Sequence, residues 1–312
     1  MDITRYAINK KMFGGNGGGS GVTIKNQNKT ITSNGTYRAD SGYTGLGTVT
    51  VNVASGGSGS GTNNLGKVIE RTATDITAED LNGVASIGAY AFYNCTGIVS
   101  VIIPDSVTSI GTYAFYNCDT LNNVTMPNNL LRIETSVFQN CKKLTNIIIP
   151  STVTEIGAYA FAACFELPTI NIPNGVASIG NSAFNNCYAL TSIIIPDSVT
   201  SLGNSAFAGC KALGTVTISK ALTGLQTYLF KDCTALASIV IPSNVTSIGS
   251  GVFQGCTALK NVTVENTTPP TLSSSTFKNC TLEKIIVPTG CGDAYKSATN
   301  WSAYADIIIE ES

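Results

Sequence analysis

The sequence predicts a solenoid of nine 23-residue coils, built from a parallel β-sheet and short helical turns, with a small N-terminal β module before it and a C-terminal cap after it. Cysteines recur at a spacing of 23 residues, with one extra residue before the last: Cys95, Cys118, Cys141, Cys164, Cys187, Cys210, Cys233, Cys256 and Cys280. A phenylalanine precedes each of them by three residues: Phe92, Phe115, Phe138, Phe161, Phe184, Phe207, Phe230, Phe253 and Phe277. This regularity fixes the fold class before any strand is assigned.

Each coil is expected to have two sides. Two apolar residues with one residue between them, such as Val101 and Ile103, indicate a short strand with one buried face. Pro104 ends that strand because proline cannot donate to a ladder. A second apolar pair, Val107 and Ile110, predicts a second side, and the glycine after it permits the next bend. The Ala-Phe-x-x-Cys stretch is expected to close the coil as a short helical turn.

The chain divides into six predicted segments. They are an N-terminal segment with a glycine-rich linker (1–21), a small β module (22–53), a Gly/Ser linker (54–62), an N-terminal cap (63–83), the solenoid (84–290) and a C-terminal cap (291–312). The linker at 54–62 lacks apolar residues apart from one alanine, which is typical of a flexible tether. Residues 63–312 are therefore expected to fold without the first three segments.

The ten cysteines do not predict a disulfide framework. Stacked coils place equivalent Cβ atoms about 4.8 Å apart, beyond the separation of about 3.5–4.5 Å that a disulfide needs. We expect the repeat cysteines to be buried free thiols in small apolar slots. A row of metal-bound thiolates is the alternative, but the chain has no histidine and no Cys-x-x-Cys pair, so no metal is expected. Cys291 lies outside the period, in the cap.

Composition excludes several classes of function. Charged residues make up 12% of the chain and the net charge is −1, too little positive charge for a nucleic-acid footprint. The apolar runs, such as 101–103, are too short to cross a bilayer, so no membrane insertion is expected. No apolar run follows the positive charges of residues 1–21, so no secretory signal peptide is expected either.

Catalysis is not expected. The commonest general base is missing, because the chain contains no histidine. The carboxylates do not recur in phase, since Glu134 and Glu155 fall at different positions of their coils. Asp105 and Asp197 both follow a strand proline, where turn chemistry accounts for them. The glycine tracts lie in linkers and not after a strand, so no phosphate-binding loop and no cofactor is expected.

The expected working surface is the outer face of the strand sheet, whose side chains recur in register without contributing to the core. The residue between the two buried strand positions forms a row, called the outer row: Ile102, Thr125, Ile148, Asn171, Ile194, Thr217, Val240 and Thr263. This uncharged mixture of aliphatic side chains, hydroxyls and an amide suits a protein or a glycan. The alternative is that β-branched residues stand there for strand propensity alone.

A second candidate surface is aromatic. Tyr90, Tyr93, Tyr113, Tyr116 and Tyr159 lie near the closing turns of the early coils, and Tyr93 and Tyr116 are the proposed binding residues among them. Tyrosine clusters favour interfaces and sugar stacking. The alternative is that these rings shield the first coils from water.

The coil resembles a known family. Residues Leu190 to Cys210, LTSIIIPDSVTSLGNSAFAGC, are similar to the repeat of the BspA-like leucine-rich-repeat family of bacterial surface proteins, and the likeness extends over about residues 84–290. The ending around Tyr295 and Trp301 resembles the cap that follows such arrays. The resemblance implies a leucine-rich-repeat solenoid that serves in adhesion and in binding host or matrix proteins, and not in catalysis.

The front of the chain differs from that family. The segments 29–37 and 48–53, KTITSNGTY and TVTVNV, resemble a small module of tail-associated structural proteins of bacteriophages and prophages. Their alternating residues and the Asn34-Gly35 turn independently predict short strands. The resemblance implies a virion-associated protein, made in the cytoplasm, whose N-terminal module docks to tail components.

Three functions therefore stay open. The first is a phage or prophage tail-associated protein that binds a host-surface protein or glycan through its solenoid. The second is a structural spacer or decoration protein of a virion. The third is a bacterial adhesin of the BspA-like type, located at the cell surface.

Overall fold

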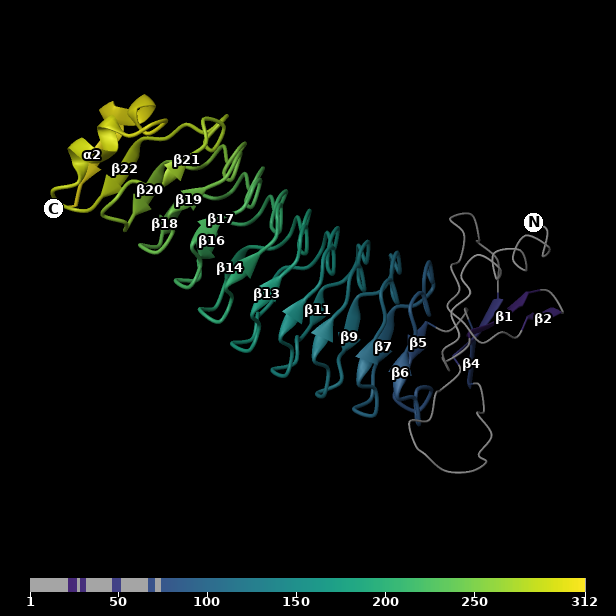
Figure 1. Cartoon of the computed structure of the whole chain (residues 1–312). Helices are drawn as coiled ribbons and strands as arrows, with labels where there is room; N and C mark the ends of the chain where they lie inside the picture. The colour runs from purple at the N-terminus through teal and green to yellow at the C-terminus, as the bar shows by residue number, and fades with distance from the viewer. Residues whose placement is uncertain (1–21, 27–28, 32–46, 52–66, 71–73, 312) are drawn as a thin grey trace, which may run out of the picture.

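The computed structural model describes the backbone of residues 22–26, 29–31, 47–51 and 67–70, and residues 74–311 with their side chains. It confirms the predicted fold class, because the repeat region winds into a parallel β-solenoid of about 10 turns of ~23 residues. Figure 1 shows the coils stacked from β5 at one end to β22 and α2 at the other. The extra turn over the nine predicted from the cysteines arises because strands outside the cysteine-bearing coils continue the stack.

The first strand of each coil contributes to one sheet, called the front sheet. Its strands are β5 (Asp75–Ile76), β7 (Ser100–Ile102), β9 (Asn123–Thr125), β11 (Asn146–Ile147), β14 (Ser192–Ile194), β16 (Thr215–Thr217), β18 (Ser238–Ile241), β20 (Asn261–Val264), β22 (Lys284–Val287) and β23 (Ile308–Glu310). Neighbouring strands pair in parallel, for example Ser100 with Asn123 and Ile102 with Thr125. Equivalent residues of successive coils therefore lie in rows along the stack.

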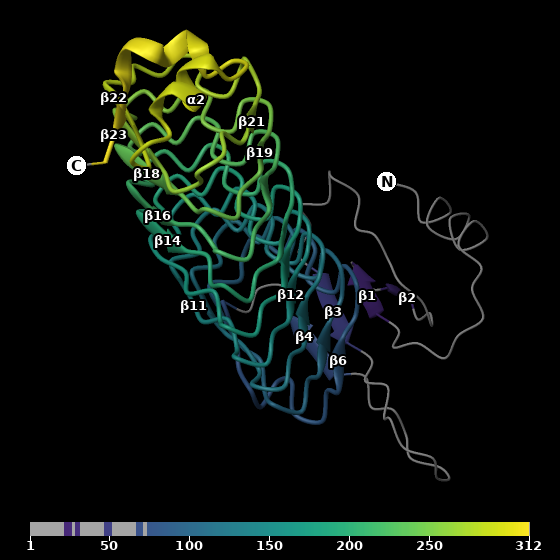
Figure 2. The same ribbon diagram turned by 60° about the vertical axis from the view of Figure 1, so that its left-hand side comes forward.

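The second strand of each coil contributes to a second parallel sheet. Its strands are β6 (Ser86–Ile87), β8 (Ser109–Ile110), β10 (Arg132–Ile133), β12 (Glu155–Ile156), β13 (Ser178–Ile179), β15 (Ser201–Leu202), β17 (Gly224–Leu225), β19 (Ser247–Ile248) and β21 (Thr271–Leu272). Figure 2 shows β11, β14, β16 and β18 along one side of the stack, and β12, β19 and β21 along the other. The apolar core lies between the two sheets.

The ladder of the front sheet is interrupted between β16 and β18, and again at residues 169–171, which form no strand although Ile170 is buried. In the neighbouring coils, Thr145 and Thr191 donate their N–H to the carbonyl groups of Asn122 and Pro168, at 3.0 and 3.1 Å. Pro168 occupies the equivalent position of its own coil and has no N–H. The ladder therefore lacks one donor at this coil, while the apolar packing continues through it.

Stacked phenylalanine rings fill the centre of the solenoid, as predicted. The nine rings from Phe92 to Phe277 form one row, with centroids 4.9–5.9 Å apart and planes within 15° of parallel. Eight of them, from Phe92 to Phe253, are almost completely buried. This row is the largest apolar contribution to the core, and each ring contributes roughly 1.5–3 kcal/mol through burial.

The glycine after the second strand has a packing role, and not the conformational role that the sequence predicted. A Cβ added to Gly203 would lie 2.2 Å from the backbone nitrogen of Asn181 in the preceding coil, and one added to Gly111 would lie 2.4 Å from that of Ala89. Neither glycine has a φ in the left-handed region. The coils approach each other so closely here that only a hydrogen atom fits.

The closing stretch of each coil, predicted as a short helical turn, is a series of linked turns and not a regular helix. The N–H of Tyr93 donates to the carbonyl of Tyr90 at 3.1 Å, but the N–H of Phe92 reaches Ala114 of the next coil at 2.7 Å. Tyr90 and Asn94 have φ values of 60° and 59°, in the left-handed region that an α-helix does not contain. Alternate N–H groups thus bind the next coil, whereas a helix would keep them within their own.

The repeat cysteines form a row of buried free thiols, as predicted. Each Sγ from Cys118 onward donates to the carbonyl of the phenylalanine in the preceding coil, for example Cys187 to Phe161 at 3.3 Å. Burial raises the pKa of the Cys164 thiol far above its usual range. Cys280, which is only partly buried, has its pKa raised to about 11 by the same cause.

The C-terminal cap closes the last coil with helix α2 (Gly292–Ser297) and the 3-10 helix η1 (Ser302–Ile307). Trp301 lies edge-on to Phe277, with ring centroids 6.5 Å apart, and so covers the end of the phenylalanine row. Its indole N–H donates to the carbonyl of Pro270 at 2.7 Å, and the hydroxyl of Tyr295 donates to Asn266 at 2.6 Å. Both rings are fully buried, so the cap donates hydrogen bonds to carbonyl groups near the open end of the stack and covers its apolar residues.

The N-terminal region contains strands β1 (Val22–Asn26), β2 (Lys29–Ile31), β3 (Gly47–Val51) and β4 (Lys67–Glu70). They pair antiparallel in the order β2-β1-β3-β4. Strand β4, which lies in the predicted N-terminal cap, thus pairs with β3. Most of the predicted linkers, including 54–62, lie outside the described residues, and the domain bounds stay predictions.

We predict that Phe184→Ala lowers the free energy of unfolding by about 3–5 kcal/mol, because its ring fills the space between Phe161 and Phe207, with centroids 5.3 Å from each. Equilibrium unfolding in urea measures this. Ile148→Ala is the control, because 75% of the Ile148 side chain is exposed and a change within about 0.5 kcal/mol is expected. Equal losses in the two variants would contradict the stacked core.

We also predict that a thiol-specific reagent modifies only Cys280 and Cys291 in the native protein, since the other eight thiols are buried. Cys280 should react slowly at neutral pH and faster as the pH rises toward 11, because its raised pKa leaves little thiolate below that value. Mass spectrometry of labelled peptides counts the sites. Modification of Cys187 before unfolding would show that the thiol row is open to solvent.

Candidate functional site

The outer row lies on the outer surface of the front sheet, where the sequence placed it. On either side of each outer-row residue the strand turns a buried residue inward, as Val101 and Ile103 do around Ile102. The four aliphatic side chains are unusually exposed for their type, at 42% for Ile102, 75% for Ile148, 66% for Ile194 and 48% for Val240. Thr125, Asn171 and Thr217 are exposed, and Thr263 is half-buried.

The structure extends this row at both ends. Thr77 directly follows Ile76, the partner of Val101, and so continues the row beyond Ile102. Strand register places Ile286 beside Thr263, and Ile309 beside Ile286. These three positions were not predicted as members of the outer row, although the 23-residue spacing from 263 to 286 and 309 indicates two of them. Thr77 follows a 25-residue step, so only the pairing of β5 with β7 shows where it lies.

The polar members of the outer row are available to a partner. The side chains of Thr125, Asn171, Thr217 and Thr263 make no hydrogen bond to any residue that the structure describes. Polar groups in contact with water can exchange that contact for a partner at modest cost, provided the partner satisfies them. The outer row therefore combines exposed apolar area with hydrogen-bonding groups that the fold itself does not use.

A second row runs parallel to the outer row on the same face, called the flanking row. It consists of the first residue of each strand or its equivalent: Asp75, Ser100, Asn123, Asn146, Thr169, Ser192, Thr215, Ser238, Asn261 and Lys284. Ser100 donates to the Asp75 carboxylate at 2.5 Å, and Asn146 donates to Asn123 at 3.0 Å. Charge occurs only at the two ends of this row, acidic at the first coil and basic at the last.

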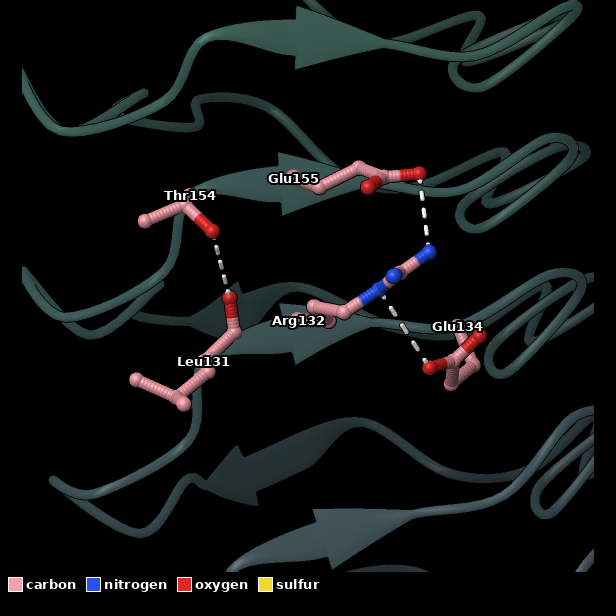
Figure 3. Close-up of polar contacts among 5 residues, drawn as sticks. All are labelled: Leu131, Arg132, Glu134, Thr154 and Glu155. Atoms are coloured by element: carbon pink, nitrogen blue, oxygen red, sulfur yellow. Dashed lines mark hydrogen bonds and ion pairs between the residues drawn. The ribbon is translucent and has the colours of Figure 1, made fainter.

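The outer surface of the second sheet differs in chemistry, because its polar groups bind one another. Figure 3 shows Arg132 between two carboxylates, with its guanidinium 3.0 Å from Glu155 and 3.5 Å from Glu134. The hydroxyl of Thr154 donates to the carbonyl of Leu131 at 3.2 Å, and four further threonines repeat this bond along the sheet. Groups bonded within the fold are less available to a partner, so the front face is the better candidate.

The tyrosines of the first two complete coils form a compact cluster, called the tyrosine cluster: Tyr90, Tyr93, Tyr113 and Tyr116. Tyr90 stacks on Tyr113 with centroids 5.0 Å apart, and Tyr93 stacks on Tyr116 at 4.9 Å. Only 9% of Tyr93 is exposed, while Tyr116 is half-buried. Tyr159 is separated from the cluster by Ser136, which holds the equivalent place in the intervening coil. The cluster covers the early coils and leaves Tyr93 little surface for a ligand.

No group of three His, Cys, Asp or Glu side chains in residues 74–311 is arranged to hold a metal ion. In the same part of the chain, no helix has the length and apolar character needed to cross a membrane. The outer row presents aliphatic, hydroxyl and amide side chains to solvent, and the charged side chains of the front face are Asp75 and Lys284 at its two ends.

Solved structures with a similar chain come from several bacteria. A leucine rich repeat protein of T. pallidum is 28% identical over 60% of this chain and 78% of that one, with a TM-score of 0.44. A leucine rich cell surface protein of Faecalibacterium prausnitzii is 24% identical, over 88% and 98%, with a TM-score of 0.41. The pneumococcal vaccine antigen PcpA is 17% identical, over 81% and 82%, with a TM-score of 0.42. No curated protein matches the chain.

The match to a protein family is more specific. The BspA type leucine rich repeat region matches in six copies, over residues 72–191 and 177–303. It is a family of repeats and not of enzymes. The matched residues begin after the N-terminal strands, so the resemblance of the N-terminal module to phage tail proteins stays a prediction. Because the matched residues make up most of the chain, the protein belongs to the BspA type leucine rich repeat family.

Proposed function

We propose that this protein is a non-catalytic recognition protein that binds a protein on a host-cell surface through its front face. The observation that carries the proposal is the outer row, in which branched aliphatic side chains stand 42–75% exposed beside hydrogen-bonding groups that the fold leaves unused. Large apolar side chains of soluble proteins are mostly removed from water, so a surface row in which they recur at every second coil, beside available hydrogen-bonding groups, is a candidate interaction site.

The size and charge of the face support a protein partner. The ten coils from Thr77 to Ile286 extend over roughly 43 Å at about 4.8 Å per coil. Such a length accommodates a standard interface of about 800 Å² per partner. The face has no charge between its two ends, which suits an uncharged protein surface better than an anionic polymer. A host-surface glycan is the second partner that the sequence predicts, and the test below separates the two.

The location of the protein belongs to the same proposal. Recognition at a host surface fits display on a phage or prophage tail, with the N-terminal module as the docking part, and equally fits an adhesin on a bacterial cell. The antiparallel sheet of β1 to β4 agrees with the short strands predicted for that module. Co-purification of the chain with tail particles would identify the first setting, and surface labelling of intact bacteria the second.

We predict that the triple variant Ile148→Lys, Asn171→Lys, Ile194→Lys lowers binding to host cells at least tenfold, because it places three charges at the centre of the front face. Its melting temperature should stay near that of the unaltered protein, since these side chains lie outside the core. Binding of labelled protein to cells and thermal unfolding measure the two quantities. Protease treatment of the cells should abolish binding to a protein partner and spare binding to a glycan.

Leu131→Lys, Ala177→Lys, Thr223→Lys is the matched control, because it adds the same charge at exposed positions of the second sheet. It should bind as the unaltered protein does. A loss of binding in the control alone would move the site to the second sheet. A loss only on replacing Tyr93 and Tyr116 would assign it to the tyrosine cluster. If neither the unaltered chain nor any variant retains a host component, the spacer function would be the one that stands.

A further inference from the structure

From Thr77 to Ile286 the outer row alternates between polar and aliphatic residues over ten successive coils, and only Ile309 of the cap, beside Ile286, departs from this order. The polar members are Thr77, Thr125, Asn171, Thr217 and Thr263, and the aliphatic members are Ile102, Ile148, Ile194, Val240 and Ile286. Long side chains thus recur at every second coil, about 9.6 Å apart at twice the strand spacing. Between each pair of long side chains lies a place occupied by a shorter, polar one.

A row of this kind is complementary to itself when a second copy is turned end for end. A two-fold axis parallel to the strands, passing between the coils of Asn171 and Ile194, sets each aliphatic side chain opposite a polar one of the other copy. The resulting pairs are Ile102 with Thr263, Ile148 with Thr217, Ile194 with Asn171, Val240 with Thr125, and Ile286 with Thr77. Each long side chain then enters the space above a short one, as in packed sheets whose side chains interdigitate.

The charges of the flanking row agree with the same axis. The rotation that pairs the outer rows carries the first coil onto the tenth, so it sets Asp75 of one copy opposite Lys284 of the other, at both ends of the contact. Ser100 holds the Asp75 carboxylate on this face through its 2.5 Å hydrogen bond. A parallel arrangement, with the axis along the stack, would set each coil opposite its own equivalent. An axis through the outer row would then place isoleucine on isoleucine, and an axis between the two rows would place Asp75 opposite Thr77. In neither case does Asp75 meet a basic side chain, as it does in the antiparallel arrangement.

We propose that the front face of this protein pairs with the front face of a second copy in this antiparallel arrangement. The proposal rests on the proposed function, because it names an occupant of the same binding face. Two-fold interfaces of identical surfaces are the commonest form of protein oligomer. A face roughly 43 Å long and about 10 Å wide, the length of a three-residue strand, covers roughly 430 Å² per copy, the size of a weak and reversible interface.

Reversal of the end charges tests the pairing in the full chain. Asp75→Lys and Lys284→Asp each place like charges together at both ends of the contact, so each should weaken the dimer at least tenfold in analytical ultracentrifugation at low salt. The double variant Asp75→Lys, Lys284→Asp restores opposite charges and should recover the affinity of the unaltered chain. An unaltered chain that stays monomeric at high micromolar concentration overturns the proposal, as does a double variant weaker than either single one.

Crosslinking tests the register independently of affinity. In one copy, Thr125 and Val240 stand five coils apart, about 24 Å at 4.8 Å per coil, but the proposed axis sets them face to face across the dimer. The variant Thr125→Cys, Val240→Cys should therefore give dimers with a short bismaleimide, above the background set by Cys280 and Cys291. Either single variant should give only that background. Equal crosslinking in the single variants would assign a different register and overturn the arrangement.

The same proteins separate this proposal from the proposed function. Host-cell binding measured on the charge-reversed single variants reports on the external partner, since their changes lie at the ends of the face and not at its centre. A monomeric chain that still binds cells through Ile148 and Ile194 would retain the proposed function and refute self-pairing. A dimer that binds no host component would retain self-pairing and refute the proposed function.

Discussion

The in-register contact between successive coils is the constraint on which the rest of the molecule depends. One coil is too thin to bury its own apolar residues, so Phe184 is buried only because Phe161 and Phe207 lie on either side of it. The backbone hydrogen bonds depend on the same contact, because alternate N–H groups of the closing turns donate to carbonyl groups of the next coil. Even the thiol of Cys187 donates to a carbonyl of the coil before it. Any shift of register would break all three kinds of contact together.

The proposed binding surface is a consequence of this stacking. A side chain that points outward at one position of the coil is repeated at that position along the stack, so a single exposed residue type becomes a row. On the second sheet, hydroxyl and charged side chains such as Thr154 and Arg132 bond to other groups of the fold, so their hydrogen-bonding capacity is already used. Where the front sheet leaves Ile148 and Ile194 exposed, the row has apolar area available for a partner.

Periodicity allowed the phenylalanine row, the free thiols and the outer row to be predicted, because each depends only on which residues recur every 23 positions. Features that depend on contacts between coils could not be predicted in this way. The role of Gly203 depends on how near Asn181 approaches, and the turn at Tyr90 depends on a left-handed backbone that tyrosine rarely adopts. The extra turn was not predicted because the coil with β22 carries no repeat cysteine, and the interruption at Pro168 was not predicted because one missing donor leaves the apolar pattern unchanged.

Residue-resolved hydroxyl-radical footprinting of the full chain, alone at low concentration and then bound to its partner, tests most directly whether the front face is the surface through which this protein interacts. Ile148 and Ile194 are large, oxidisable and exposed, while Leu131 is a comparable probe on the second sheet at 61% exposure. The account predicts strong protection of Ile148 and Ile194 on binding, with Leu131 and Tyr159 unchanged. Protection of Leu131 or Tyr159, with Ile148 and Ile194 still oxidised at their free rates, would contradict it.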